Sequence, residues 1–122
     1  MKVSSVAWKS AQDRAESVAW VDVRDFDALW HHSGDYVGHK GAGSTAPEKY
    51  AEAGAFIQTH SSLFFPRITM RDDVPEFADG RHTTAWLRDH GSESIPMICD
   101  QDTLQKLMRL CPAKRYETFY QS

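Results

Sequence analysis

The residues whose types and spacing best suit chemistry form the run Asp79-Gly80-Arg81-His82, where an extended segment passes into a helix. The first turn of a helix leaves backbone N–H groups unpaired and carries the positive end of the helix dipole. An arginine and a histidine in that turn add to its positive character. Gly80, Arg81 and His82 are therefore a candidate site for an anion such as a nucleotide phosphate.

The same run also has a purely structural interpretation, which the residues alone favour. Asp79 would cap the helix, and Gly80 would permit the turn that precedes it. Ala85 and Trp86 would pack inward, and Arg88 would pair with a carboxylate. A glycine-rich run, residues 38–45, also leads into a helix, but it fits neither of the common phosphate-loop patterns and is better explained as a connector.

Other kinds of chemistry find little support. His31 and His32 are adjacent, so on a helix they diverge by about 100° and do not easily share one metal ion. The six histidines show no H-x-x-x-H spacing, and Cys99 and Cys111 form no C-x-x-C pair. No G-x-S-x-G run is present. We therefore expect no metal, no cofactor, no catalytic residue and no enzymatic activity.

The elements that must position these residues alternate between strands and helices. A strand is predicted over 15–23, with the stretch 3–8 pairing with it as a hairpin. A short helix capped by Asp25 follows, with Phe26, Leu29 and Trp30 on its buried side. Thr45 begins the form of a capping box, which predicts a second helix that ends near His60.

The second half continues the alternation. Strands are predicted over 67–71 and around Phe77, joined by an Asp72-Asp73 turn, and another over 95–99. Asp100 is expected to cap a last helix whose apolar side holds Leu104, Leu107, Met108 and Cys111, and 115–120 could add an edge strand. These elements predict an α+β fold, α/β-like in its alternation, with a small mixed β-sheet and about four helices packed on it.

Composition limits the class of protein. A chain of 122 residues and 13.9 kDa, with 41% hydrophobic residues, suits one globular domain spanning 1–122. A net charge of −3 argues against binding nucleic acid directly through its phosphates. No apolar run approaches the about 20 residues that a membrane span needs, and no secretory signal is seen at the start. We therefore expect a cytoplasmic protein with reduced cysteines and no membrane partner.

The run from Asp79 to Gly91, followed by Ile95-Pro96-Met97, is similar to the nucleotide-binding signature of the ParB/sulfiredoxin superfamily. It resembles more closely a group of small bacterial plasmid fertility inhibition factors, which look related to immunity proteins of contact-dependent growth inhibition systems. Thr83 stands where relatives usually carry a second arginine, so one phosphate-pairing side chain is missing. Arg81 stands where sulfiredoxin chemistry needs a cysteine. The resemblance implies a ParB/sulfiredoxin-like fold whose chemistry is reduced or lost.

The resemblance and the acidic segments together predict an immunity protein that binds one cognate toxin domain, one-to-one. A nuclease toxin is expected, because the cleft that holds phosphates is positive and would attract an acidic surface. The predicted contact residues are Asp22, Asp25, Asp27, Trp30, Asp35, Tyr36, Asp72 and Asp73. The alternative is a ParB/sulfiredoxin-like plasmid fertility inhibition factor that binds a nucleotide at Gly80, Arg81 and His82.

Overall fold

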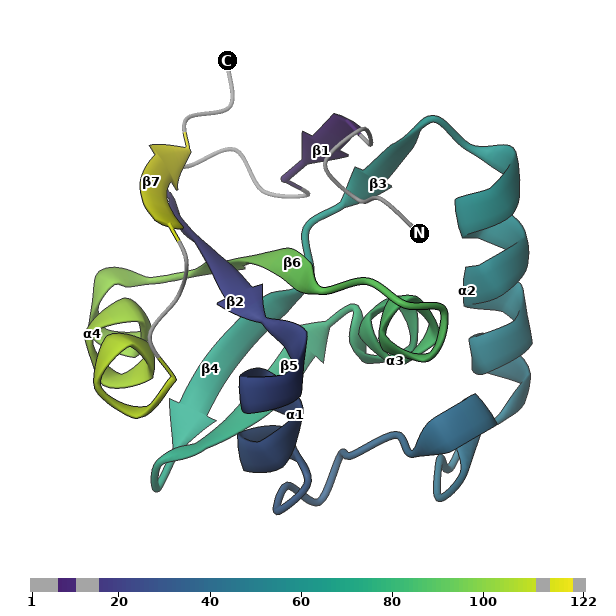
Figure 1. Ribbon diagram of the computed structural model, residues 1–122, viewed down its shortest axis with the longest axis horizontal. Coiled ribbons are helices and arrows are strands. Elements are labelled where there is room, and N and C mark those ends of the chain that lie inside the picture. Colours follow the sequence, from purple (N-terminus) through teal and green to yellow (C-terminus); the bar gives the residue numbers. More distant parts are fainter. Residues whose placement is uncertain (1–6, 11–15, 112–114, 120–122) are drawn as a thin grey trace.

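The central feature of the fold is a five-stranded mixed sheet with the strand order β5-β4-β6-β2-β7 (Figure 1). The structure is a computed structural model that describes residues 7–10, 16–111 and 115–119. The strands are β2 (Glu16–Asp22), β4 (Arg67–Arg71), β5 (Val74–Asp79), β6 (Ser94–Cys99) and β7 (Arg115–Phe119). β6 runs antiparallel to β2 and parallel to β4, so the predicted mixed sheet is confirmed.

The neighbouring strands β2 and β6 form the middle of the core. Val18 pairs with Ile98 and Val21 with Ile95, and all four side chains are at most 1% exposed. Strands covered on both faces read as continuous apolar runs rather than as alternating ones. This is why β2 and β6 stand out in the sequence. β7 pairs with β2 and forms one edge of the sheet.

The described part of the chain holds four α-helices beside this sheet, which confirms the α+β prediction. They are α1 (Val23–Trp30), α2 (Glu48–Thr59), α3 (Arg81–Asp89) and α4 (Gln101–Leu110), with a 3₁₀ turn, η2, at His39–Gly41. α1 packs near β2 and β5, α4 packs near β2 and β4, and α2 packs on α3. Figure 1 shows α2 and α4 at opposite ends of the long axis.

One of the four predicted helix N-terminal caps is present in the structure, and the other three are not. The Asp100 carboxylate accepts a hydrogen bond from the Thr103 N–H at 2.8 Å, as predicted. Asp25 is not a cap, because the Asp22 carboxylate accepts from the Asp25 N–H and the helix starts earlier. Asp79 is not a cap either, because it ends β5 and Gly80 holds the N-cap position. Where two nearby residues could each cap a helix, the end of the preceding strand determines which of them holds the N-cap position.

The predicted capping box at Thr45 does not form. α2 begins at Glu48, and its N-cap, Pro47, makes no side-chain hydrogen bond. Ser44 instead accepts from the Ala46 N–H through its hydroxyl at 3.0 Å. At the other end of the chain, Met108 is 45% exposed and does not share the buried face of α4.

The predicted N-terminal hairpin is wrong in the described residues. β1 (Ala7–Lys9) pairs in parallel with β3 (Ser62–Phe64) and forms a separate two-stranded sheet. Trp8 stacks on Phe65, with ring centroids 5.9 Å apart, which fixes this pair against the core. The remainder of the predicted strand, residues 3–6, lies outside the described part. Alternation marks a strand but does not select its partner.

Candidate functional site

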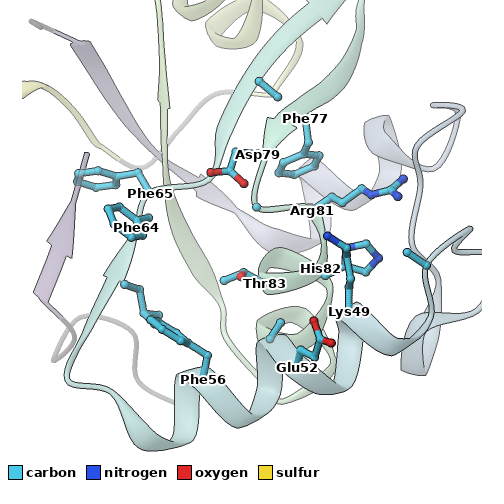
Figure 2. A pocket seen from close by; sticks show the side chains of 15 residues that line it. Lys49, Glu52, Phe56, Phe64, Phe65, Phe77, Asp79, Arg81, His82 and Thr83 are labelled. Atoms are coloured by element: carbon cyan, nitrogen blue, oxygen red, sulfur yellow. The ribbon is translucent and has the colours of Figure 1, made fainter. Parts of the chain in front are cut away.

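A hollow of about 550 Å³ lies at the start of α3, between α2, β3 and the end of β5 (Figure 2). We call it the α3 hollow. Lys49, Arg81 and His82 lie along one side of it, with Phe77 beside Arg81, and the rings of Phe56, Phe64 and Phe65 line the other side. Its volume falls within the roughly 300–1,000 Å³ typical of small-molecule sites. The predicted anion turn is thus open to a ligand of that size.

Gly80 makes the turn that opens this hollow. Its φ is +88°, and a Cβ at this position would lie 2.8 Å from the Cα of Pro66. Both the conformation and the close approach of the two backbones therefore require glycine. The Gly80 carbonyl accepts from the N–H and the hydroxyl of Thr84, each at 2.9 Å, and no side chain caps the helix. The first-turn N–H groups of α3 are consequently not capped by a side chain of the residues that the structure describes.

Two cations line the α3 hollow without a carboxylate partner. Among the described residues, no carboxylate lies within ion-pair distance of the Arg81 guanidinium or the Lys49 ammonium, and Arg81 donates only a long 3.4 Å hydrogen bond to the Thr45 hydroxyl. Glu52 and Asp79 also line the hollow and temper its charge. Lys49 comes from α2, one helix away from the predicted turn, so sequence inspection of the turn alone misses it.

His82 is 8% exposed and contacts the Ser44 hydroxyl through its Nε2 atom at 2.8 Å. Burial lowers the pKa of His82 below its ordinary value, and the positive charges of Arg81 and Lys49 lower it further. The imidazole is therefore neutral at pH 7. A neutral histidine can orient a ligand by hydrogen bonding but adds no charge.

A second polar cluster surrounds Arg88 and holds the loop 31–47 against α3. The guanidinium donates to the Asp27 carboxylate and to the Asp89 carboxylate, each at 2.9 Å, and to the Val37 carbonyl at 2.7 Å. Asp89 also accepts from the Tyr50 hydroxyl at 2.7 Å, and Asp27 accepts from the Tyr36 hydroxyl at 3.0 Å. The predicted carboxylate partner of Arg88 is thus confirmed. Asp27 and Tyr36, proposed as partner contacts, already serve this cluster.

Trp30 cannot act as a surface anchor, because its side chain is 0% exposed. Its indole N–H donates to the Asp35 carboxylate at 2.7 Å, and the other oxygen of Asp35 accepts from the Phe77 N–H at 2.7 Å. The prediction that Trp30 contacts a partner is therefore wrong. Its i, i+4 spacing with Phe26 was the sequence signal that Trp30 lies on the buried side of α1. Asp35 joins α1 to β5.

The structure divides the remaining predicted contact residues between two places. Asp22, Asp25 and Asp27 line a second hollow of about 560 Å³ together with Glu93, which we call the acidic hollow. Asp72 and Asp73 lie elsewhere, in the β4–β5 turn, where both have positive φ and Asp73 pairs with Arg109 at 3.0 Å. Of the two groups, only Asp22, Asp25 and Asp27 line the acidic hollow.

Two absences concern the described residues alone. No group of three or more His, Cys, Asp or Glu side chains there is arranged to hold a metal ion. No helix in the same part of the chain combines the length and hydropathy of a membrane span.

The sequence analysis did not identify Phe56 and Phe64, two phenylalanines of the α3 hollow, as site residues. Phe56 lies off the side of α2 that buries Gly54 and Ile57 and is 40% exposed, and Phe64 ends β3 and is 45% exposed. An apolar side chain that falls outside the buried stripe of its helix is the available signal for such a position. For Phe64 the sequence offers no comparable signal.

The fold and the α3 hollow define a small α+β domain with an open ligand-sized hollow at a helix start. No protein-family model and no curated protein matches the chain. The chain is similar in structure to the Oncogenic Suppression Activity Protein, a plasmid fertility inhibition factor whose crystal structure was determined as a gold(I) cyanide derivative. The TM-score is 0.64 at 18% sequence identity, over 87% of this chain. The match spans 61% of that protein's length, so the two share a fold over part of the longer chain.

Proposed function

We propose that this chain is a fertility-inhibition-type protein whose α3 hollow binds the phosphate groups of a nucleotide. The observation that carries the proposal is the pair of cations, Arg81 and Lys49, that line the hollow with no carboxylate partner among the described residues. Two such charges beside uncapped N–H groups favour a ligand with negative charge. Binding, rather than turnover, is the activity proposed.

Lys49 can replace the positive charge that is lost because this chain has Thr83 where relatives usually carry an arginine. In the resemblance to ParB-like proteins, that arginine would pair with phosphate in the first turn of the helix. Here a cation from α2 lies on the same hollow and can supply the second charge. The fold likeness to a plasmid fertility inhibition factor supports the same direction.

Calorimetric titration with ATP tests this proposal. We expect measurable binding to the unmodified protein and a loss of about tenfold or more in affinity for Arg81→Gln and for Lys49→Gln, since each removes a charge-assisted contact. Arg109→Gln, which changes an exposed arginine outside the hollow, should leave the affinity unchanged. Absence of ATP binding at millimolar concentration would contradict the proposal.

A second candidate function is the immunity protein, acting in the cytoplasm on one toxin domain, and the acidic hollow favours it. Asp22, Asp25, Asp27 and Glu93 line this surface, against Arg24 and an Arg88 already paired with two carboxylates. A basic side chain of a nuclease toxin would find a complementary charge there. The toxin would carry positive charge on the surface that contacts the acidic hollow.

Survival of cells that express a candidate toxin separates the two functions. For an immunity protein, Asp25→Lys with Glu93→Lys should abolish protection, while Arg81→Gln should retain it. For a nucleotide-binding protein, the same acidic double variant should bind ATP with unchanged affinity. Protection that survives the double charge reversal would exclude the acidic hollow as the toxin contact.

A further inference from the structure

The side of the α3 hollow away from the cations consists of aromatic rings that the fold leaves open. Phe56 projects from α2 and Phe64 from β3, and Figure 2 shows both on the side opposite Arg81 and His82. They are 40% and 45% exposed. The other large exposed apolar side chain in the described residues, Met108, does not line this hollow.

Each of these two rings already has one partner. The His60 imidazole stacks on Phe56, with centroids 3.7 Å apart and planes 11° apart. The Lys9 ammonium lies 4.4 Å from the centroid of the Phe64 ring. A ring that is held by one partner and is still about 40% exposed can offer a flat surface to the hollow at little cost in side-chain freedom. Such a surface suits stacking with another flat ring.

Few polar side chains accompany the rings. Ala53, Leu63 and Phe65 are the neighbouring lining residues on this side, and none carries a side-chain donor or acceptor. The charged lining residues are Lys49 and Glu52 of α2, Asp79 at the end of β5 and Arg81 of α3, and Figure 2 shows Lys49 and Arg81 away from Phe64. One side of the hollow therefore suits an anionic group of a ligand, and the other side suits an aromatic ring.

We infer that the base of the bound nucleotide stacks on Phe56 and Phe64, so that the site recognises the face of the ring and tolerates different bases. This inference rests on the proposed function, because the phosphates must lie at Arg81 and Lys49 for the base to reach the rings. Stacking on aromatic side chains is tolerant of sequence because every base has a π-face. Purines, with the larger ring area, should bind more tightly than pyrimidines.

The test compares ATP, GTP, CTP and inorganic tripolyphosphate by titration calorimetry. We expect ATP and GTP to bind within about threefold of each other, CTP less tightly, and tripolyphosphate about tenfold less tightly than ATP, because it lacks the ring. Phe56→Ala and Phe64→Ala should reduce the affinity for ATP toward that for tripolyphosphate and leave tripolyphosphate binding unchanged. Met108→Ala, at an equally exposed position outside the hollow, should change neither.

The outcomes separate this inference from the proposed function. Tripolyphosphate binding as tight as ATP binding would overturn the stacking inference and leave the phosphate site standing. Discrimination of more than about tenfold between ATP and GTP would also overturn it, because it would require hydrogen bonds to base edges. If neither ligand binds, both proposals fail. Melting temperatures of the alanine variants, expected to stay near that of the parent because both positions are exposed, exclude unfolding as the cause.

Discussion

Gly54 of α2 lies directly against the indole of Trp86 on α3. A Cβ at Gly54 would lie 2.7 Å from Cδ1 of that indole and still closer to its Nε1 atom. Trp86 is held on its other side by His90, whose ring stacks on it with centroids 3.7 Å apart. The absence of a side chain at one residue therefore sets how closely α2 approaches α3.

Replacing Gly54 by alanine should destabilise the protein. The added methyl group gains about 1 kcal/mol of helix propensity. Overpacking against a fixed indole costs typically about 1–3 kcal/mol, so the net effect should be a loss. Urea unfolding measures it. Gly34→Ala is the matched control, because nothing lies within 4 Å of a Cβ there. Equal stability of the two variants would mean that Trp86 moves aside freely.

Replacing Arg88 by methionine should lower the free energy of unfolding by about 3–5 kcal/mol at pH 7, because it leaves the carboxylates of Asp27 and Asp89 without their partner. Arg109→Met, which breaks an exposed pair with Asp73, should cost less than about 1 kcal/mol. Chemical denaturation at pH 7 distinguishes the two. A loss as small as that of the control would show that Asp89 gains water when Arg88 is removed.

Acid should weaken the contribution of Asp89 to the free energy of unfolding. Burial raises the pKa of this carboxyl, but hydrogen bonds from Arg88 and Tyr50 outweigh burial and hold it below its ordinary value of 3.8. A lowered pKa in the folded state stabilises the protein above the unfolded value, and this stability is lost as the pH falls through the folded pKa. The difference between the parent and Arg88→Met should therefore shrink below about pH 4. A constant difference down to pH 2 would contradict this account.

His82 should titrate below its ordinary pKa of 6.5, because burial and the charges of Arg81 and Lys49 disfavour the imidazolium. The stability that this neutral histidine contributes is present above pH 6.5 and declines as the pH falls through that value toward the folded pKa. NMR titration of the ring protons measures the shift. Lys49→Gln should raise the pKa, whereas Lys106→Gln, on α4, should not. A His82 pKa at or above 6.5 in the parent would contradict the prediction.

Cys99 and Cys111 should resist thiol reagents in the native protein. Both are buried thiols outside any disulfide, and burial raises the pKa of Cys111 to about 11, with smaller contributions from the charges of Asp25 and Asp22. Since the thiolate is the reactive form, neither should react rapidly at pH 8. Ellman titration should find both thiols only after denaturation. Rapid reaction of one thiol in the folded protein would place it nearer the surface than the structure does.

Local signals in the sequence determined the elements that flank the candidate site. Gly80 predicted the turn because few other residues adopt its positive φ, and the structure has φ +88° there. The Asp100 cap and the apolar run over 95–99 were likewise recognisable, because capping and the burial of a central strand depend on neighbouring residues. The sequence also marked Phe26 and Trp30 as one buried side of α1, although Trp30 was assigned to a partner surface as well.

The tertiary structure alone decided which of these elements meet. β1 pairs with β3 rather than β2, and the α3 hollow joins Lys49, Phe64 and Arg81 from α2, β3 and α3. Nothing in the spacing of these residues predicts their proximity, since strand pairing and helix docking are chosen by contacts between distant segments. The glycine turn at which we propose an anion binds could therefore be located from the sequence. The second cation and the aromatic side of the hollow could not, because they belong to elements that only folding brings beside it.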